Sequence, residues 1–290
     1  MINVGRRIPG VATLALAVAL LAPFAHAELT PPRPSPNASV TQGVGLTNLS
    51  MTYSRPGVKA RKIWGELVPM DKPWRTGANE ATTFTTSTDI QVAGKTLPAG
   101  TYSFFTIPSK DSWTVIFSKQ KELWGAYEYD DKQDQLRVTA KPVTGQPNQE
   151  WMWLGFDNLT PTSCDLVLRW ETLSLALPIT VEVNERFLSL ARTEIAAAKT
   201  DDWRTPFVAA RYSFDNNLAL VEGKQWLDKS VAIQATHANL ALHARWLAKD
   251  GNTKDAIATA KKAVELGKAA KPPADVAPTE KLIAEWSATK

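Results

Sequence analysis

Cysteine is almost absent from this sequence, since Cys164 is the only one in 290 residues. A single cysteine excludes an intramolecular disulfide, even in a compartment that would permit one. On a strand, Cys164 would share a face with Leu166, Leu168 and Trp170. We therefore expect it to be a small buried hydrophobic residue rather than a reactive thiol.

Histidine is nearly as scarce. The three are His26, close to the N-terminus, and His237 and His243 in the C-terminal third, so residues 28–185 contain none. This excludes histidine-based metal sites and Ser-His-Asp triads from the middle of the chain. His237 and His243 are six residues apart, which places them on different faces of a helix. We expect neither a metal site nor a cofactor.

Long apolar runs are also missing, because the run from Val11 to Leu21 is too short to span a bilayer. It follows Arg6 and Arg7 and precedes a small-x-small cleavage pattern that ends at Ala27. We predict that residues 1–27 are a cleavable signal peptide and that the mature chain is exported, periplasmic or secreted, without a transmembrane segment. Both Sec and twin-arginine export stay open.

The excess of positive charge is small. The formal net charge of +4 falls to +2 without residues 1–27, because they hold two arginines and no acid. The sequence pI near 9.0 is therefore no argument for nucleic-acid binding. We expect no nucleic-acid partner.

What the chain does contain is β-type sequence followed by helical sequence. Residues 28–37 are rich in proline and predict an extended linker. In residues 38–184, short stretches of β-branched and aromatic residues alternate with turn residues. The predicted strands are 38–42, 48–54, 81–86, 89–93, 101–107, 113–119, 136–142, 150–156, 163–170 and 173–183. About ten short strands indicate an antiparallel β-sandwich or jelly roll.

Several of these strands are apolar on both faces, as the neighbours Phe104 and Phe105 and the run from Trp151 to Phe156 show. A solvated sandwich needs only one apolar face per strand. We expect that the helical segment covers part of the outside.

From residue 185 the apolar period changes to about 3.6, which predicts five or six amphipathic helices in residues 185–290. Around a turn at Gly251, alanines at 244, 256, 260 and 263 match positions of a tetratricopeptide unit. Gly223 and Ser230 precede Ala256 and Ala263 by 33 residues. We predict a small tetratricopeptide-like domain, with a plain antiparallel bundle as the alternative. The fold class is thus α+β and multidomain.

The stretch from Tyr53 to Glu80 is the first candidate for a functional site. Between Arg55 and Glu80 it carries six basic residues against three acids, with two tryptophans between them. Planar cations beside indoles suit an anion or a flat polar ligand. A connection of roughly two dozen residues inside a compact domain is usually functional or disordered, and its apolar residues argue against disorder. Adding two aromatic residues of a later loop, the candidate ligand-binding residues are Tyr53, Arg55, Lys59, Arg61, Trp64, Trp74, Arg75, Asn79, Glu80, Trp124 and Tyr127.

Several motifs occur in order along the β-type region: Ser35-Pro-Asn-Ala-Ser-Val, Val58-Lys-Ala-Arg-Lys-Ile-Trp-Gly, Trp74-Arg-Thr-Gly-Ala-Asn-Glu, Leu97-Pro-Ala-Gly-Thr-Tyr-Ser, Trp113-Thr-Val-Ile-Phe and Trp124-Gly-Ala-Tyr. Together they resemble the motifs of the Domain of Unknown Function 2911 family of bacterial exported proteins. The resemblance covers residues 35–183 and implies a β-sandwich and export, with no established activity. The helical region resembles the tetratricopeptide-like tail that some members carry.

Three functional hypotheses follow. In the first, the sandwich is a binding module for a small anionic or polar ligand or a glycan. In the second, it is an envelope hydrolase directed at glycans, with Glu80 paired to Glu66 or Asp71 as the weak catalytic candidate. In the third, the helical domain is a scaffold for a protein partner. A structural interpretation stands against these hypotheses, in which Arg75 and Glu80 only form an internal ion pair.

Overall fold

The computed structural model describes residues 31–121 and 123–288. The predicted signal peptide, residues 1–27, lies outside these ranges. Residues 31–34 belong to a different unit from residues 35–288, and the description below concerns the latter. Within the described ranges, none of the helices has the length and apolar character that crossing a bilayer requires.

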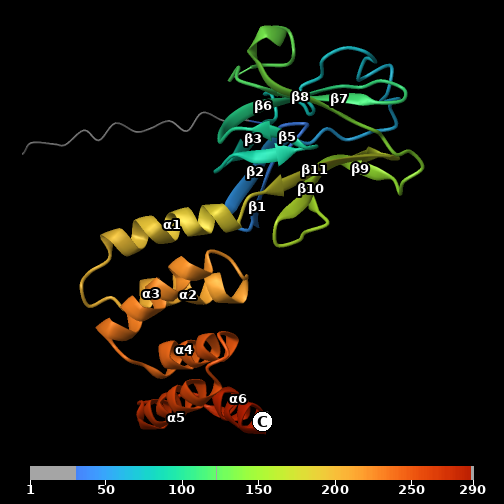
Figure 1. Cartoon of the computed structure of the whole chain (residues 1–290). Coiled ribbons are helices and arrows are strands. Elements are labelled where there is room, and N and C mark those ends of the chain that lie inside the picture. The colour runs from blue at the N-terminus through green and yellow to red at the C-terminus, as the bar shows by residue number, and fades with distance from the viewer. Residues whose placement is uncertain (1–30, 122, 289–290) are drawn as a thin grey trace, which may run out of the picture. The chain divides into compact units, whose positions relative to one another are not determined.

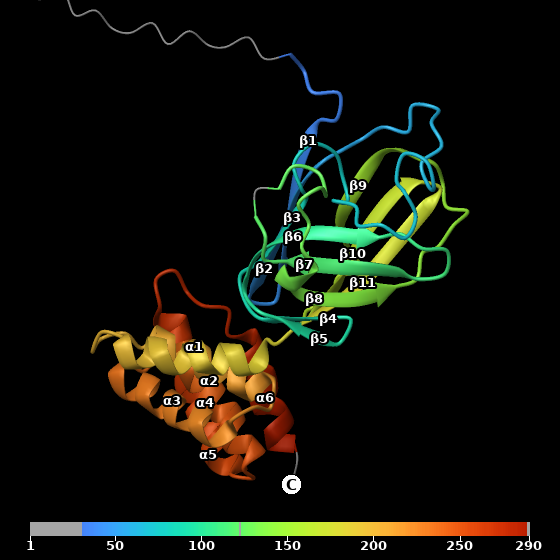
Figure 2. The ribbon, with the colours of Figure 1, turned by 90° about the horizontal axis from the view of Figure 1, so that it is seen from above.

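Two antiparallel sheets make up the first part of the chain (Figures 1 and 2). One has six strands in the order β1-β2-β3-β6-β7-β8, and the other has five in the order β5-β4-β11-β10-β9. The strands are β1 Asn37–Val44, β2 Thr47–Ser54, β3 Thr83–Thr86, β4 Ile90–Val92, β5 Lys95–Leu97, β6 Gly100–Ile107, β7 Trp113–Ser118, β8 Asp134–Ala140, β9 Gln149–Asp157, β10 Ser163–Glu171 and β11 Leu173–Val181. The predicted sandwich is confirmed.

The core between the sheets follows from strict alternation along the strands. On β2, Leu49, Met51 and Tyr53 are buried while Asn48 and Thr52 are exposed. On β11, every second residue from Leu173 to Val181 is buried. Because strand side chains alternate between the two faces, these residues all point to the same side of their sheet. Cys164 is buried in the same core with Leu166, Leu168 and Trp170, as predicted.

One strand was not predicted. Strand β5 pairs with β4 across a two-residue turn formed by Ala93 and Gly94, both with positive φ. Such a turn is a type I′ hairpin, whose usual sequence signals are Asn-Gly or Asp-Gly. Alanine at its first position gave no such signal, and β5 itself is only three residues long.

We predicted that the helical segment covers part of the outside of the sandwich. This prediction is wrong for the apolar outer patch on β6 and β7. Phe105 and Ile116, which point away from the main core, form a separate buried cluster with Leu123, against which Tyr129 and Ala126 pack. The connection between β7 and β8 therefore covers this patch on β6 and β7. Sequence periodicity showed that a cover was needed but not which segment supplies it.

Six helices follow in the described residues: α1 Asn184–Ala197, α2 Arg204–Asp215, α3 Leu220–Ile233, α4 His237–Lys249, α5 Thr253–Ala269 and α6 Ala277–Ala288. Helix α4 begins with a capping box, in which Thr236 and Asn239 each satisfy the other's backbone N–H. The helices have their own core, which includes Leu188, Leu227 and Trp246.

The helices pack as successive pairs, α2 with α3 and α4 with α5. Gly251, with a φ of +85°, forms the turn between α4 and α5. Ala244, Ala256, Ala260 and Ala263 are completely buried in the second pair. Small residues at the predicted repeat positions thus allow the helices to approach closely, as a tetratricopeptide-like arrangement requires.

Candidate functional site

The connection between β2 and β3, residues 55–82, is ordered and joins both sheets. Gly57 bridges to Trp151 of β9, and Trp74 bridges to Thr106 of β6. Two backbone hydrogen bonds of 2.8 and 2.9 Å hold the second bridge. Ile63 and Val68 of the same connection are buried in the main core. The sequence argument against disorder is therefore confirmed.

The two tryptophans of the connection belong to a cluster of four indoles. The ring of Trp64 lies 5.9 Å from Trp74, 5.0 Å from Trp113 and 5.8 Å from Trp170, edge to face in each case. Trp74 and Trp170 are stacked at 5.8 Å. Such aromatic pairs stabilise a core by about 0.5–1.5 kcal/mol beyond the burial of their area. Trp74 is buried in the main core, and the partly buried Trp64 packs against that core.

Trp74 and Trp170 line a cavity of about 180 Å³ together with Arg61 and Arg75. The remaining lining residues are Ser35, Pro56, Leu67, Val68, Gly77 and Ala78. The wall therefore carries two guanidinium groups and no carboxylate among the described residues. Three of the eleven predicted residues, Arg61, Trp74 and Arg75, meet here.

Arg75 differs from the other arginines of the sandwich in having no partner. No ion pair or hydrogen bond to its guanidinium group occurs within the described residues, and its Nε is buried without an acceptor. Burial lowers the pKa of Arg75, and the nearby Tyr127 acts in the opposite direction. Since the ordinary pKa of arginine is above about 12, the group is a cation at neutral pH. The predicted Arg75–Glu80 ion pair is not formed.

Two indole N–H groups near Arg75 are also unsatisfied. The Nε1 atoms of Trp64 and Trp170 are buried and have no acceptor in the described part of the chain, whereas Nε1 of Trp74 donates to the Gly77 carbonyl at 3.2 Å. Leaving a buried donor unpaired costs about 1–3 kcal/mol. All three unsatisfied groups around this cluster are donors, and two of them, on Arg75 and Trp170, belong to residues that line the cavity.

The other predicted cations make contacts within the protein, and of them Arg61 alone lines the cavity with Arg75. Arg55 donates its Nε to the Met152 carbonyl at 2.8 Å. Arg61 donates to the Gly57 carbonyl at 2.6 Å and to Val58, which fixes its side chain at the rim of the cavity. Lys59 lies 5.7 Å from the ring centre of Trp151, as a cation–π contact.

Two further predicted residues have structural roles. The buried hydroxyl of Tyr53 donates to the Leu154 carbonyl at 2.9 Å and accepts from the Leu154 N–H at 3.0 Å, which links the two sheets. Asn79 donates its amide to the Ser35 carbonyl and to the Ser54 hydroxyl, both at 3.2 Å. These contacts position the connection rather than a ligand.

Glu80 lies at a different cavity, of about 210 Å³, which it lines with Tyr53, Asn37 and four small residues of β2 and β3 and the chain just before β3. It is the only acid of that wall within the described residues. Glu66 is on the surface, in an ion pair of 3.1 Å with Lys62. A glycosidase needs two carboxyl groups across one sugar, so this arrangement gives the hydrolase hypothesis no support.

Trp124 and Tyr127 are exposed and belong to a loop that reaches Arg75. Their exposed fractions are 61% and 89%. A Cβ placed on Gly125, between them, would lie 3.5 Å from Nη1 of Arg75 and 2.8 Å from the ring of Tyr127. The guanidinium group therefore contacts this loop at one end, and it lines the cavity as well.

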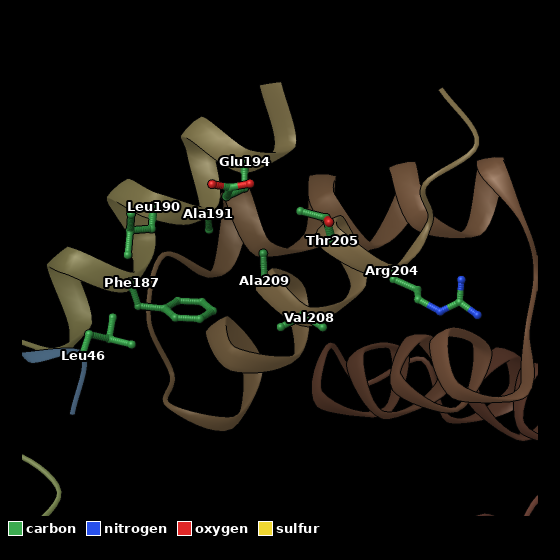
Figure 3. Close-up of a pocket in the computed structure, with 9 residues that line it drawn as sticks. All are labelled: Leu46, Phe187, Leu190, Ala191, Glu194, Arg204, Thr205, Val208 and Ala209. Atoms are coloured by element: carbon green, nitrogen blue, oxygen red, sulfur yellow. The ribbon is translucent and has the colours of Figure 1, made fainter. Parts of the chain in front are cut away.

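A larger cavity, of about 340 Å³, lies elsewhere and contains none of the predicted residues (Figure 3). Its wall is formed by Phe187, Leu190, Ala191 and Glu194 of α1, Arg204, Thr205, Val208 and Ala209 of α2, and Leu46 of the turn between β1 and β2. It is an apolar groove with one acid and one base. Sequence reasoning missed it, because amphipathic helices give no sign of which apolar residues stay uncovered.

Sequence reasoning also missed Trp170 as part of the site. It is 1% exposed and sits on a strand whose other inward residues are aliphatic core. Nothing in the local pattern distinguishes it from them. The signal is tertiary, since only the stacking with Trp74 brings it to the cavity wall.

One of three comparisons with known proteins found a match. Searches of curated proteins and of solved structures found no match. The family described as protein of unknown function (DUF2911) matches residues 35–179, which include every strand from β1 to β10, most of β11, and the cavity of Arg75. Because the match covers half of the chain, the protein belongs to the DUF2911 family.

Proposed function

We propose that the sandwich is a binding module in which the cavity of Arg61 and Arg75 takes the anionic group of a polar ligand. The observation that carries the proposal is the unpaired guanidinium group of Arg75 in a wall without acids. A charge that is partly removed from water and has no partner destabilises the folded protein. A ligand oxyanion compensates this cost, and a hydrogen bond to a charged group contributes about 1.5–3 kcal/mol.

Binding of simple oxyanions to the full mature chain tests this proposal. We expect sulfate or phosphate to raise the melting temperature relative to chloride at equal ionic strength, and Arg75→Gln to raise the dissociation constant at least tenfold. Arg211→Gln is the matched control, because it removes the same charge from an exposed position on α2. Equal oxyanion binding by wild type and Arg75→Gln would refute the role of Arg75.

Stability separates this role from a structural one. Because no ion pair of Arg75 is broken and an unpaired half-buried charge is removed, Arg75→Gln should leave the free energy of unfolding unchanged or raise it. A loss of about 3–5 kcal/mol would instead indicate a broken buried pair.

The groove of Figure 3 favours a second function, a protein-interaction scaffold in the helical domain. Leu190 and Val208 on its wall are 44% and 50% exposed. Exposed apolar groups that lie together mark interaction surfaces. We expect Leu190→Arg to abolish capture of an envelope protein by the full chain. Val221→Arg, at an exposed position of α3 outside this wall, should leave capture unchanged.

Export completes the proposal. The n-region, apolar run and cleavage pattern of residues 1–27 support it. Mass spectrometry of the mature protein from its producing cell should give an N-terminus at Glu28. An intact Met1 would rule out cleavage.

A further inference from the structure

The loop beside Arg75 holds its backbone in place while exposing two aromatic side chains. Leu123 is buried, and its carbonyl accepts a hydrogen bond of 2.8 Å from the Ala81 N–H. Trp124 bridges to Glu80 through the backbone, and Gly125 is buried. Trp124 and Tyr127 project from these anchors and are 61% and 89% exposed. Large aromatic groups held in water at fixed positions mark a contact surface.

This aromatic surface and the cavity share the guanidinium group of Arg75. Gly125 has a φ of +76°, and its Cα lies so close to Nη1 of Arg75 and the ring of Tyr127 that a Cβ would contact both. Tyr127 is also near enough for its charge to influence the pKa of Arg75. A ligand held by Arg75 therefore has this loop as its next neighbour.

The size of the cavity limits what enters it. Pockets that enclose a whole small molecule have volumes of about 300–1,000 Å³. The cavity of Arg75 has about 180 Å³, which accommodates an oxyanion but not the molecule that carries it. The rest of the ligand must lie outside the cavity, and the loop that carries Trp124 and Tyr127 adjoins Arg75.

The open aromatic surface favours a sugar over a nucleotide as that outer part. A nucleobase gains most from an enclosed apolar slot, whereas Trp124 and Tyr127 form no slot and stay mainly in water. The C–H face of a pyranose ring packs on one indole while its hydroxyl groups remain hydrated. A polymer of such sugars can extend along an open surface.

We infer that the ligand is an acidic glycan, with a uronate carboxylate or a sulfate ester in the cavity of Arg61 and Arg75 and a sugar ring on Trp124. This inference rests on the proposed function and specifies its ligand. The two guanidinium groups on the lining and the absence of acids from that wall favour an oxyanion. The exposed indole of Trp124 favours a sugar ring as the outer part of the ligand.

Calorimetry with the full mature chain tests the inference. The probes are trigalacturonate, a sulfated chondroitin disaccharide, a neutral galactose trisaccharide, uridine monophosphate and inorganic sulfate. We expect one of the two acidic glycans to bind at least tenfold more tightly than both the neutral trisaccharide and inorganic sulfate. The one that does so identifies the oxyanion as carboxylate or sulfate ester.

Three variants assign the contributions. Trp124→Ala should reduce the affinity for the acidic glycan to that for inorganic sulfate and leave sulfate binding unchanged. Arg75→Gln should abolish both. Trp151→Ala is the control, because Trp151 is also exposed but lies on β9 beside Lys59. Thermal unfolding of each variant confirms that the fold is intact.

The outcomes separate the two proposals. If sulfate binds through Arg75 but neither acidic glycan binds more tightly, the inference is wrong and the proposed function stands. Tighter binding of uridine monophosphate than of both glycans also overturns the inference. If no oxyanion binds at all, both fail.

Discussion

A half-buried guanidinium group without an acceptor destabilises a fold, so its retention at Arg75 needs a reason. Arg55 shows what the same chain does with an arginine that only supports structure, since it donates to the Met152 carbonyl. Arg75 makes no such bond among the described residues. Stability given up at one residue is characteristic of binding sites.

At this scale the sequence could predict the type of site but not its members. The alternation of cations and indoles in residues 53–80 pointed to the right connection. The acceptor of Arg55, however, lies 97 residues away, and that of Asn79 lies 44 residues away. No local pattern reveals carbonyl groups of distant strands, so structural cations and a ligand-binding cation look alike in the sequence.

Tyr53 is expected to stabilise the sandwich rather than bind a ligand. Tyr53→Phe leaves both the N–H and the carbonyl of Leu154 without a partner in the core, which should lower the free energy of unfolding by about 1–3 kcal/mol. Urea denaturation measures this loss. Tyr127→Phe, at a residue 89% exposed, should have no measurable effect. Equal stability of Tyr53→Phe and wild type would contradict the role assigned to this hydroxyl.

Because of Cys164, the free energy of unfolding of the sandwich should fall as the pH becomes alkaline. Burial, and then the charge of Asp165, raise the pKa of the thiol to about 11. Because this folded pKa lies above the unfolded value, the thiol's contribution is complete below about pH 8.5 and is lost as the pH rises towards 11. Over that range, denaturant unfolding should show a steeper loss of stability in wild type than in Cys164→Ala.

Tyr53 and Tyr102 also make the fold less stable as the pH rises, since burial raises the pKa of each hydroxyl. Only the difference between the two pH profiles therefore reports on Cys164. Parallel profiles would show that the thiol titrates normally. At pH 8 the folded chain should resist labelling by a thiol reagent until denaturant is added.

At the scale of elements, the connection of residues 55–82 is a rigid part of the sandwich. Lys59, Ala60, Asp71, Thr76 and Asn79 all have positive φ values. Each such residue costs about 1–2 kcal/mol relative to ordinary backbone. The bridges to β9 and β6 and the burial of Ile63 and Val68 offset this cost. The length and composition of the connection predicted that it is ordered. They did not predict that several of its residues other than glycine adopt left-handed backbone conformations.

The helical pairs depend on small residues where they cross. A Cβ on Gly223 of α3 would lie 2.6 Å from Cβ of Ser213 on α2 and 3.0 Å from the ring of Trp246 on α4. Gly223→Ala should therefore lower the free energy of unfolding by about 1–3 kcal/mol through overpacking. Circular dichroism at 222 nm during denaturation measures this change.

Helix propensity alone predicts the opposite result, because alanine favours a helix by about 1 kcal/mol over glycine. Val221→Ala is the control on the same helix, since Val221 is 79% exposed and its replacement should change stability by less than about 0.5 kcal/mol. A Gly223→Ala variant more stable than wild type would exclude close packing at this crossing.

At the scale of the whole molecule, the residues that the structure describes form two main cores that share no residue. One contains the four indoles and the inward residues of both sheets, and the other contains residues of α1 to α4. The change of apolar period near residue 185 predicted this division, because a period of two and a period of 3.6 build different layers. We propose that residues 38–184 and 185–290 are separate domains.

Independent cores should unfold independently, so we expect two transitions in urea. The signal at 222 nm reports mainly the helices, whereas the near-ultraviolet signal includes the indole cluster of the sandwich as well as Trp226 and Trp246 of the helical core. A transition seen in the near-ultraviolet but not at 222 nm therefore reports the sandwich. Tyr53→Phe should shift only the transition of the sandwich and Gly223→Ala only that of the helices, because each residue lies in one core region. A fragment of residues 28–183 should then fold and bind sulfate as the full chain does. Coincident transitions that both variants shift together would show one cooperative unit, because substitutions in separate cores could not otherwise move the same equilibrium.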